Sequence, residues 1–212
     1  MDVSKIEQLW EGGEKKVLNK LRFLDLNRSM LSTLDLGLTP NLEKLNLGEC
    51  SNLVELHMPI ECLNLIYVDL RGSKLIRTLD LRLAPNLEEL ILSFCNNLEK
   101  LQMPDRCLNL QSLLLSNSKL MTLDIGQTPN LRNLDLKQNY YLEELDMADE
   151  CQMLSNLNVS YSKLRTLDLR LTPNLERLDL DRCYDLVELC LPIGDLKKLV
   201  HLHFSTWGFG YL

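Results

Sequence analysis

The chain has 212 residues, of which 45% are hydrophobic and only 6% aromatic, and its formal net charge at pH 7 is −7. This acidic balance disfavours nucleic acid and anionic membrane surfaces as partners, because a phosphate backbone attracts Lys and Arg rather than carboxylates. No apolar run is long enough to span a bilayer, and residues 1–7 lack the apolar segment of a secretory signal.

One leucine pattern recurs along almost the whole chain. Residues 154–174 follow LxxLxLxxSxLxxLDLxxTPN, with Val159 at one leucine place. Near copies begin at Leu21, Leu42, Leu65, Leu87, Leu110, Leu131, Leu154, Leu175 and Leu199. Successive starts lie 21, 23, 22, 23, 21, 23, 21 and 24 residues apart. A period in this range, with leucine at the first, fourth and sixth places, is typical of leucine-rich repeats.

Each repeat is expected to form one coil of an α/β-type repeat solenoid, a leucine-rich-repeat horseshoe. The LxxLxL segment predicts a short strand, and stacked coils would place these strands in one parallel β-sheet on the concave face. About ten further residues leave no room for a long helix, so the convex segments should be mostly irregular, 3₁₀ or short strands. Turns such as Thr39–Asn41 contain proline, which cannot donate a ladder hydrogen bond, and return the chain to the next strand.

The repeats run through the chain without a change of composition, so we expect one elongated domain over residues 1–212. Residues 1–20 match the latter part of a repeat, and residues 199–212 begin a last repeat that is truncated. The aromatic residues Phe204, Trp207, Phe209 and Tyr211 would either fold back over the last coil or leave a strand edge exposed.

The ninth residue of each repeat forms a second pattern. Serine-type repeats alternate with cysteine-type repeats, so that a two-repeat unit recurs every 44 or 45 residues. A small side chain at this place is expected to lie inside the coil and to bond backbone groups that the turn leaves unpaired. We interpret the set as a structural ladder of Ser29, Cys50, Ser73, Cys95, Ser118, Asn139, Ser162 and Cys183.

Seven cysteines cannot all pair within the chain, and six of them recur at equivalent repeat places. Three occupy the ninth place, and the other three lie 20 residues after a repeat start: Cys62, Cys107 and Cys151. This pattern indicates small buried hydrophobes in a reducing compartment rather than a disulfide framework. We therefore expect a cytoplasmic or nucleocytoplasmic location.

The third and fifth residues of each repeat are expected to point outward on the concave face. Most are polar, but Ile91 and Leu114 lie in the same row on adjacent strands. Exposed apolar clusters with aromatic and charged neighbours tend to mark interaction sites. We predict a partner-binding patch of Tyr67, Arg71, Glu89, Ile91, Phe94 and Leu114. The alternatives are sequence drift on a tolerant surface and docking against another domain.

No grouping of residues has catalytic or cofactor-binding spacing. The sequence contains no serine, histidine and acid at nucleophile spacing and no glycine-rich phosphate loop. His201 and His203 share one strand face, but two imidazoles without a third ligand disfavour a metal site. A recurrent acidic row is interpreted as solvated surface: Asp35, Asp80, Asp124 and Asp168. We therefore expect neither an enzyme nor a cofactor nor a bound metal.

Residues 4–12, SKIEQLWEG, resemble the SKIExLWEG segment that opens the repeat region of plant intracellular immune receptors. These are nucleotide-binding leucine-rich-repeat proteins, in particular the class with a Toll/interleukin-receptor-like N-terminal domain. The alternation of serine-type and cysteine-type repeats, and the segment Leu53–Leu56, are similar to the same family over essentially the entire chain. The resemblance implies recognition of a pathogen effector or host protein, and autoinhibition of a receptor until that partner binds. It implies no nucleotide site here, because the GxxxxGK(S/T) loop is missing.

These features predict a non-enzymatic protein-recognition module that binds another protein through its concave face. A free-standing scaffold or decoy protein with the same fold is the first alternative. An extracellular repeat receptor is less favoured, because a secretory signal, paired-cysteine caps and the Gly-x-Ile-Pro pattern of that class are missing.

Overall fold

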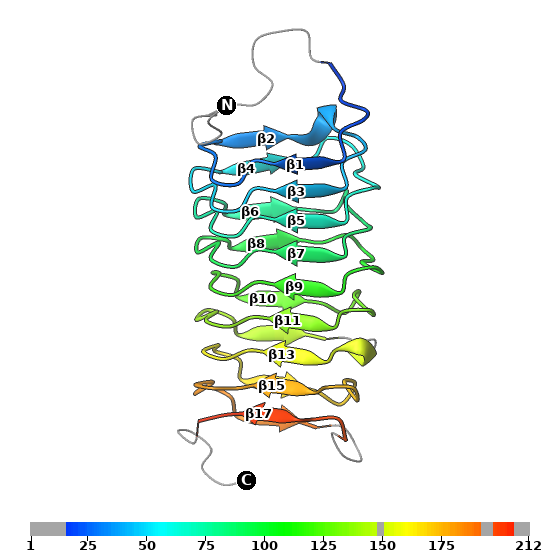
Figure 1. Cartoon of the computed structure of the whole chain (residues 1–212). Helices are drawn as coiled ribbons and strands as arrows, with labels where there is room; N and C mark the ends of the chain where they lie inside the picture. Colours follow the sequence, from blue (N-terminus) through cyan, green and yellow to red (C-terminus); the bar gives the residue numbers. More distant parts are fainter. Residues whose placement is uncertain (1–15, 148–150, 192–196, 206–212) are drawn as a thin grey trace.

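The computed structural model describes residues 16–147, 151–191 and 197–205. The predictions that concern residues 1–15 and the tail from Trp207 onward lie outside these residues. Within them the chain winds into stacked coils, which form a β-solenoid with two layers of strands (Figure 1).

One layer is a single parallel sheet of nine three-residue strands, in the order β1-β3-β5-β7-β9-β11-β13-β15-β17. The strands are β1 Phe23–Asp25, β3 Lys44–Asn46, β5 Tyr67–Asp69, β7 Glu89–Ile91, β9 Ser112–Leu114, β11 Asn133–Asp135, β13 Asn156–Asn158, β15 Arg177–Asp179 and β17 His201–His203. Each begins two residues after one of the nine predicted repeat starts. The prediction of a leucine-rich-repeat solenoid with one parallel sheet is therefore confirmed.

The opposite layer consists of four separate two-stranded parallel sheets: β2 Thr33–Asp35 with β4 Glu55–His57, β6 Thr78–Asp80 with β8 Lys100–Gln102, β10 Thr122–Asp124 with β12 Glu144–Asp146, and β14 Thr166–Asp168 with β16 Glu188–Cys190. Two short 3₁₀ helices follow outer strands, η2 Leu36–Leu38 and η3 Cys151–Met153. The prediction of short strands and 3₁₀ turns in this layer is confirmed. Each pair joins a serine-type coil to the coil that follows it, which carries cysteine or, for β12, Asn139 at the ninth place. The second coil of each pair is longer, at 23 or 24 residues against 21 or 22, and its added residues lie partly before and partly after the outer strand.

Leucines fill the space between the two layers. In the coil that contains β5, Leu65, Val68 and Leu70 are completely buried, and the equivalent residues of the other coils join them in one continuous core. A single coil cannot cover its own leucines, so stability comes from stacking each coil on its neighbours.

In the eight coils that start at Leu21 to Leu175, the eighth residue adopts the left-handed conformation, with φ between 56° and 72°; these residues are Arg28, Glu49, Gly72, Phe94, Asn117, Gln138, Tyr161 and Arg182. In the first seven, the backbone N–H donates to the carbonyl oxygen of the seventh residue in the next coil, at 2.6–2.9 Å. Only Gly72 adopts this conformation without a Cβ penalty. The recurrent left-handed residue thus links successive coils just beyond the C-terminal ends of the strands in the nine-stranded sheet.

The eight residues of the ninth-place ladder lie in the interior directly after these turns. Cys50, Cys95 and Cys183 point their thiols at a backbone carbonyl oxygen of the preceding coil, with sulfur–oxygen distances of 3.1–3.2 Å. Asn139 accepts from the backbone N–H and the hydroxyl of Ser118, both at 2.7 Å, and donates to two carbonyls. A second interior ladder, at the opposite corner of the coils, consists of Thr39, Cys62, Ala84, Cys107, Thr128, Cys151 and Thr172. All seven cysteines of the chain are unpaired.

Candidate functional site: the nine-stranded face

The nine-stranded face is the side of the sheet that points away from the leucine core, and the third and fifth residues of each coil lie on it. On the end strands β1 and β17 both of these residues are exposed. On the five strands from β5 to β13 every one of them is half-buried or buried, because neighbouring side chains cover one another. The middle of the face is therefore a packed surface rather than a row of free side chains.

The fifth residue has a structural task that the sequence interpretation missed. Its side-chain oxygen accepts the backbone N–H of the residue two places later at 2.9–3.0 Å, and so caps the turn that ends the strand. The residues that make this bond are Asp25, Asn46, Asp69, Asp135, Asn158 and Asp179. The signal was present in the sequence as a recurrent Asp or Asn at one repeat place.

Ile91 and Leu114 interrupt this row, because neither side chain carries an oxygen that could accept the N–H of Ser93 or Ser116. The expectation that Ile91 is exposed is wrong: the side chain is only 5% exposed. Among the described residues it is the one buried hydrophobic residue outside the continuous core. Its register partners in the same row are Asp69 on β5 and Leu114 on β9, which flank it on both sides. Leu114 itself is half-buried.

A charged network adjoins this apolar pair. The Asp69 carboxylate is 3% exposed and binds the Arg71 guanidinium, with Nη2 2.6 Å from Oδ2 and Nε 3.0 Å from Oδ1. The Tyr67 hydroxyl donates to Asp69 Oδ2 at 3.4 Å. The hydrogen bond to Asp69 raises the pKa of the Arg71 guanidinium, and burial followed by the Asp69 charge raises the pKa of the Tyr67 hydroxyl. Both groups therefore keep their protons at neutral pH.

The structure brings most of the predicted patch together. Tyr67 and Glu89 are register partners on β5 and β7, as are Ile91 and Leu114 on β7 and β9. Arg71 joins them through Asp69, which the predicted patch did not include and which a Tyr-x-Asp-x-Arg spacing could have suggested. Phe94 stands at the turn after β7 and is 51% exposed, in the left-handed conformation with φ 63°. Of the six predicted residues, Arg71 and Phe94 are exposed and Ile91 is covered.

A shallow groove of about 410 Å³ continues from Leu114 toward the C-terminal end of the face. Its outward-pointing polar residues are Asn133, Asp135, Asn156, Asn158, Arg177, Asp179, His201 and His203. His203 Nδ1 lies 3.2 Å from Asp179 Oδ1, a contact that gains charge attraction only when the imidazole is protonated. No group of three possible metal ligands occurs in the described part of the chain. The face thus passes from an apolar island at Ile91 and Leu114 to a polar groove.

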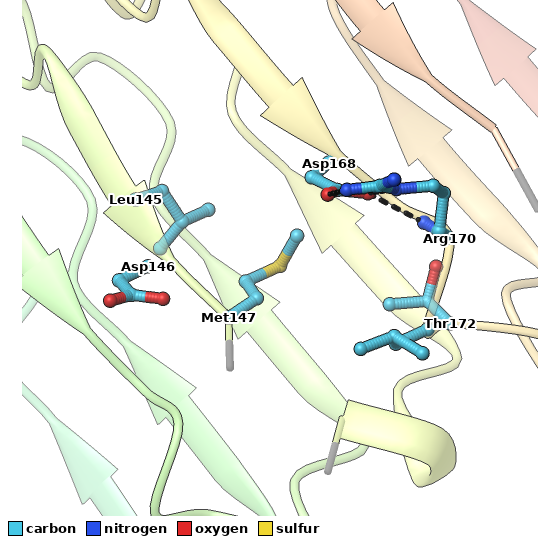
Figure 2. A pocket seen from close by; sticks show the side chains of 7 residues that line it. Leu145, Asp146, Met147, Asp168, Arg170 and Thr172 are labelled. Carbon is cyan, nitrogen blue, oxygen red and sulfur yellow. Dashed lines mark hydrogen bonds and ion pairs between the residues drawn. The ribbon is translucent and has the colours of Figure 1, made fainter. Parts of the chain in front are cut away.

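The opposite layer has hollows between its two-stranded sheets. One of about 360 Å³ lies between β12 and β14, where Met147 reaches toward the paired Asp168 and Arg170 (Figure 2). A larger one of about 540 Å³ lies between β8 and β10.

The parallel coils with buried leucines at the first, fourth and sixth places have the architecture of a leucine-rich-repeat solenoid. Part of the chain is 44% identical over 66 residues to disease resistance protein RPS6 of Arabidopsis thaliana, a match that covers 30% of this chain and 6% of that protein. No protein-family model matches the chain.

Two solved structures match over most of this chain. The functional domain of InlJ from Listeria monocytogenes, described as including a cysteine ladder, is 19% identical over 87% of this chain and 49% of that chain, with a TM-score of 0.44. The leucine-rich-repeat protein LIC12759 from Leptospira interrogans is 19% identical over 88% of this chain and 84% of that chain, with a TM-score of 0.31. Among the described residues, no helix is sufficiently long and apolar to cross a membrane.

Proposed function

We propose that the chain is a non-enzymatic protein-recognition module of a plant disease-resistance receptor. It binds a pathogen effector or a host protein through the nine-stranded face, in the cytoplasm or the nucleus. The observation that carries this proposal is the local identity to a disease resistance protein in a chain that folds as a leucine-rich-repeat solenoid.

The interruption at Ile91 and Leu114 supports the choice of surface. At six other coils the same place holds a turn-capping oxygen, and a hydrogen bond of this kind contributes about 0.5–1.5 kcal/mol. The two adjacent coils that contain Ile91 and Leu114 lack that bond and have aliphatic side chains on the face instead. Phe94 and Arg71 flank this island, and exposed aromatic and arginine side chains are the usual anchors of protein interfaces.

Autoinhibition follows if the same face rests against another domain of the receptor until the partner displaces it. Such a switch requires that the partner bind the open state more tightly than the closed state. Residues that contact the partner would then also contact the inhibiting domain, so their substitution would weaken both contacts.

The test is capture of partners by the tagged chain from plant tissue with and without pathogen challenge. The variant Phe94→Ala/Leu114→Asn removes the exposed anchor and the edge of the island. The matched control is Val187→Asn, which changes an exposed hydrophobic residue beside outer strand β16. Loss of the captured protein in the first variant and its retention in the control support the proposal. Equal capture by both variants contradicts the assignment to this face.

A further inference from the structure

The outer layer repeats one arrangement of aspartate and turn. The last residue of each serine-type outer strand is an aspartate whose Oδ1 accepts the N–H of the residue two places later, at 2.7–3.1 Å. In two coils that later residue is an arginine. Arg82 binds Asp80 with Nη2 2.7 Å from Oδ2 and Nε 3.0 Å from Oδ1, and Arg170 binds Asp168 in the same way.

The coil that contains β10 lacks this arginine, because Gly126 stands in its place. Asp124 accepts the Gly126 N–H at 2.8 Å, and within the described residues it takes part in no ion pair. Its register partner on β12 is Asp146, a second carboxylate on the same edge. Asp35 also precedes a glycine turn, but that residue makes a further interaction.

The hollow beside Asp124 is the counterpart of the one shown in Figure 2, since Leu101, Met103, Asp124, Gln127 and Thr128 occupy the places of Leu145, Met147, Asp168, Leu171 and Thr172. It measures about 540 Å³, against about 360 Å³ where Arg170 is present. Its charged lining residues are Asp105 and Asp124, with no cationic side chain among them. Neither carboxylate takes part in an ion pair among the described residues, and the Asp105 charge contributes to the raised pKa of Arg82.

We propose that the hollow between β8 and β10 binds the guanidinium group of an arginine side chain from a partner protein. The guanidinium would make with Asp124 the contacts that Arg82 and Arg170 make with their own aspartates. Guanidinium and carboxylate match as a planar bidentate pair, and the aliphatic stem of arginine packs well on apolar walls such as Leu101 and Met103.

The occupant is a segment of protein rather than a free small cation. Asp124 is solvent-exposed, and a single exposed ion pair contributes little by itself. A peptide adds contacts of its neighbouring residues with Leu101 and Met103, which a free small cation lacks. This surface is separate from the nine-stranded face, so the inference does not depend on which residues of that face bind a partner.

The test is a titration of the ¹⁵N-labelled full chain with the capped peptide acetyl-Leu-Arg-Leu-amide, followed by NMR. The matched peptide has citrulline in place of arginine, which keeps the shape and removes the charge. Arginine peptide should shift the amide signals of Thr122, Gly126 and Gln127, and the citrulline peptide should shift them at least about fivefold less. Equal shifts from both peptides overturn the proposal. Free arginine amide that shifts these signals as strongly as the peptide overturns the assignment to a protein segment.

Asp124→Asn removes the charge and keeps an oxygen for the turn, so it should abolish the shifts without unfolding the coil. Asp124→Ser, whose hydroxyl can also cap the turn, provides a second variant with the same expected loss. The matched control is Asp80→Asn, at an aspartate already held by Arg82, and it should leave the peptide response unchanged. Full peptide shifts in both Asp124 variants contradict the site.

Discussion

Asp69 on β5 and Ile91 on β7 are register partners in one row of the nine-stranded face, and both are almost completely buried. Asp69 accepts the N–H of Arg71 and binds its guanidinium, whereas Ile91 has no acceptor for the turn that follows it. At this pair the face therefore changes from a row of polar residues that cap their own turns to an apolar island of Ile91 and Leu114. The island ends at Asp135 on β11, which again caps its own turn.

The ninth-place ladder offers a matched pair of serine-to-alanine substitutions. The Ser118 hydroxyl donates to Asn139 Oδ1, whereas the buried Ser73 hydroxyl has no hydrogen-bond partner. Ser118→Ala should lower the free energy of unfolding by about 0.5–1.5 kcal/mol, the net value of one hydrogen bond. Ser73→Ala should leave stability unchanged or raise it, because it removes an unpaired buried polar group. Denaturant unfolding of both variants checks this, and a larger loss for Ser73→Ala would contradict the ladder.

A side chain at Gly72 should lower stability, although the other coils carry side chains at this place. Its φ is 72°, and a Cβ atom there would lie 2.8 Å from Glu49 Oε2. Gly72→Ala should therefore lower the free energy of unfolding, with about 1–2 kcal/mol from the left-handed backbone alone. The double variant Glu49→Ala/Gly72→Ala removes the contact and keeps the backbone penalty. If the double variant were as stable as Glu49→Ala alone, backbone strain at the eighth place would be excluded.

Six cysteines should resist thiol reagents in the folded chain. Burial raises the pKa of Cys95 to about 12 and those of Cys107 and Cys151 to about 11, and the thiolate is the reactive form. Cys190 is the one half-exposed cysteine, although a hydrogen bond with Glu188 raises its pKa as well. Mass spectrometry after brief alkylation should find modification at Cys190 first. Rapid modification of Cys95 in the folded chain would show that the ladder is open to solvent.

The outer ion pairs predict a weak dependence of stability on pH. Hydrogen bonds from Arg82 and Arg170 lower the pKa values of Asp80 and Asp168. A carboxyl whose pKa is lowered on folding stabilises the folded state at pH values above its ordinary pKa of about 3.9. This contribution disappears as the pH falls through the lowered pKa. The wild-type advantage over Asp80→Asn/Asp168→Asn should shrink on acidification. It should also shrink with added salt, since all four side chains are exposed and solvent screens them. An advantage that grows below the ordinary carboxyl pKa would contradict the pairing.

The positions of the strands could be predicted from the leucines alone. Inward-pointing leucines alternate with outward-pointing residues within each strand, and the coil length is nearly constant, so the start of every strand follows from the pattern. The left-handed eighth residue could not be predicted, since only Gly72 and Asn117 among the eight are residue types that favour this conformation. The burial of Ile91 also escaped prediction. Alternation correctly places Ile91 on the outward side, but its exposure depends on how Asp69 and Leu114 pack beside it, which requires the register between coils.

Two adjacent leucines of β9 have separate roles: Leu113 holds the coils together, and we propose that Leu114 faces a partner. Leu113 is 1% exposed within the core, whereas Leu114 is half-buried on the nine-stranded face. The most direct measurement is the free energy of unfolding of Leu113→Ala and Leu114→Asn. Leu113→Ala should cost about 2–5 kcal/mol through lost burial and cavity formation. Leu114→Asn should change stability by less than about 1.5 kcal/mol, because its oxygen can restore the turn bond that the other coils make. Equal losses in the two variants would contradict the account.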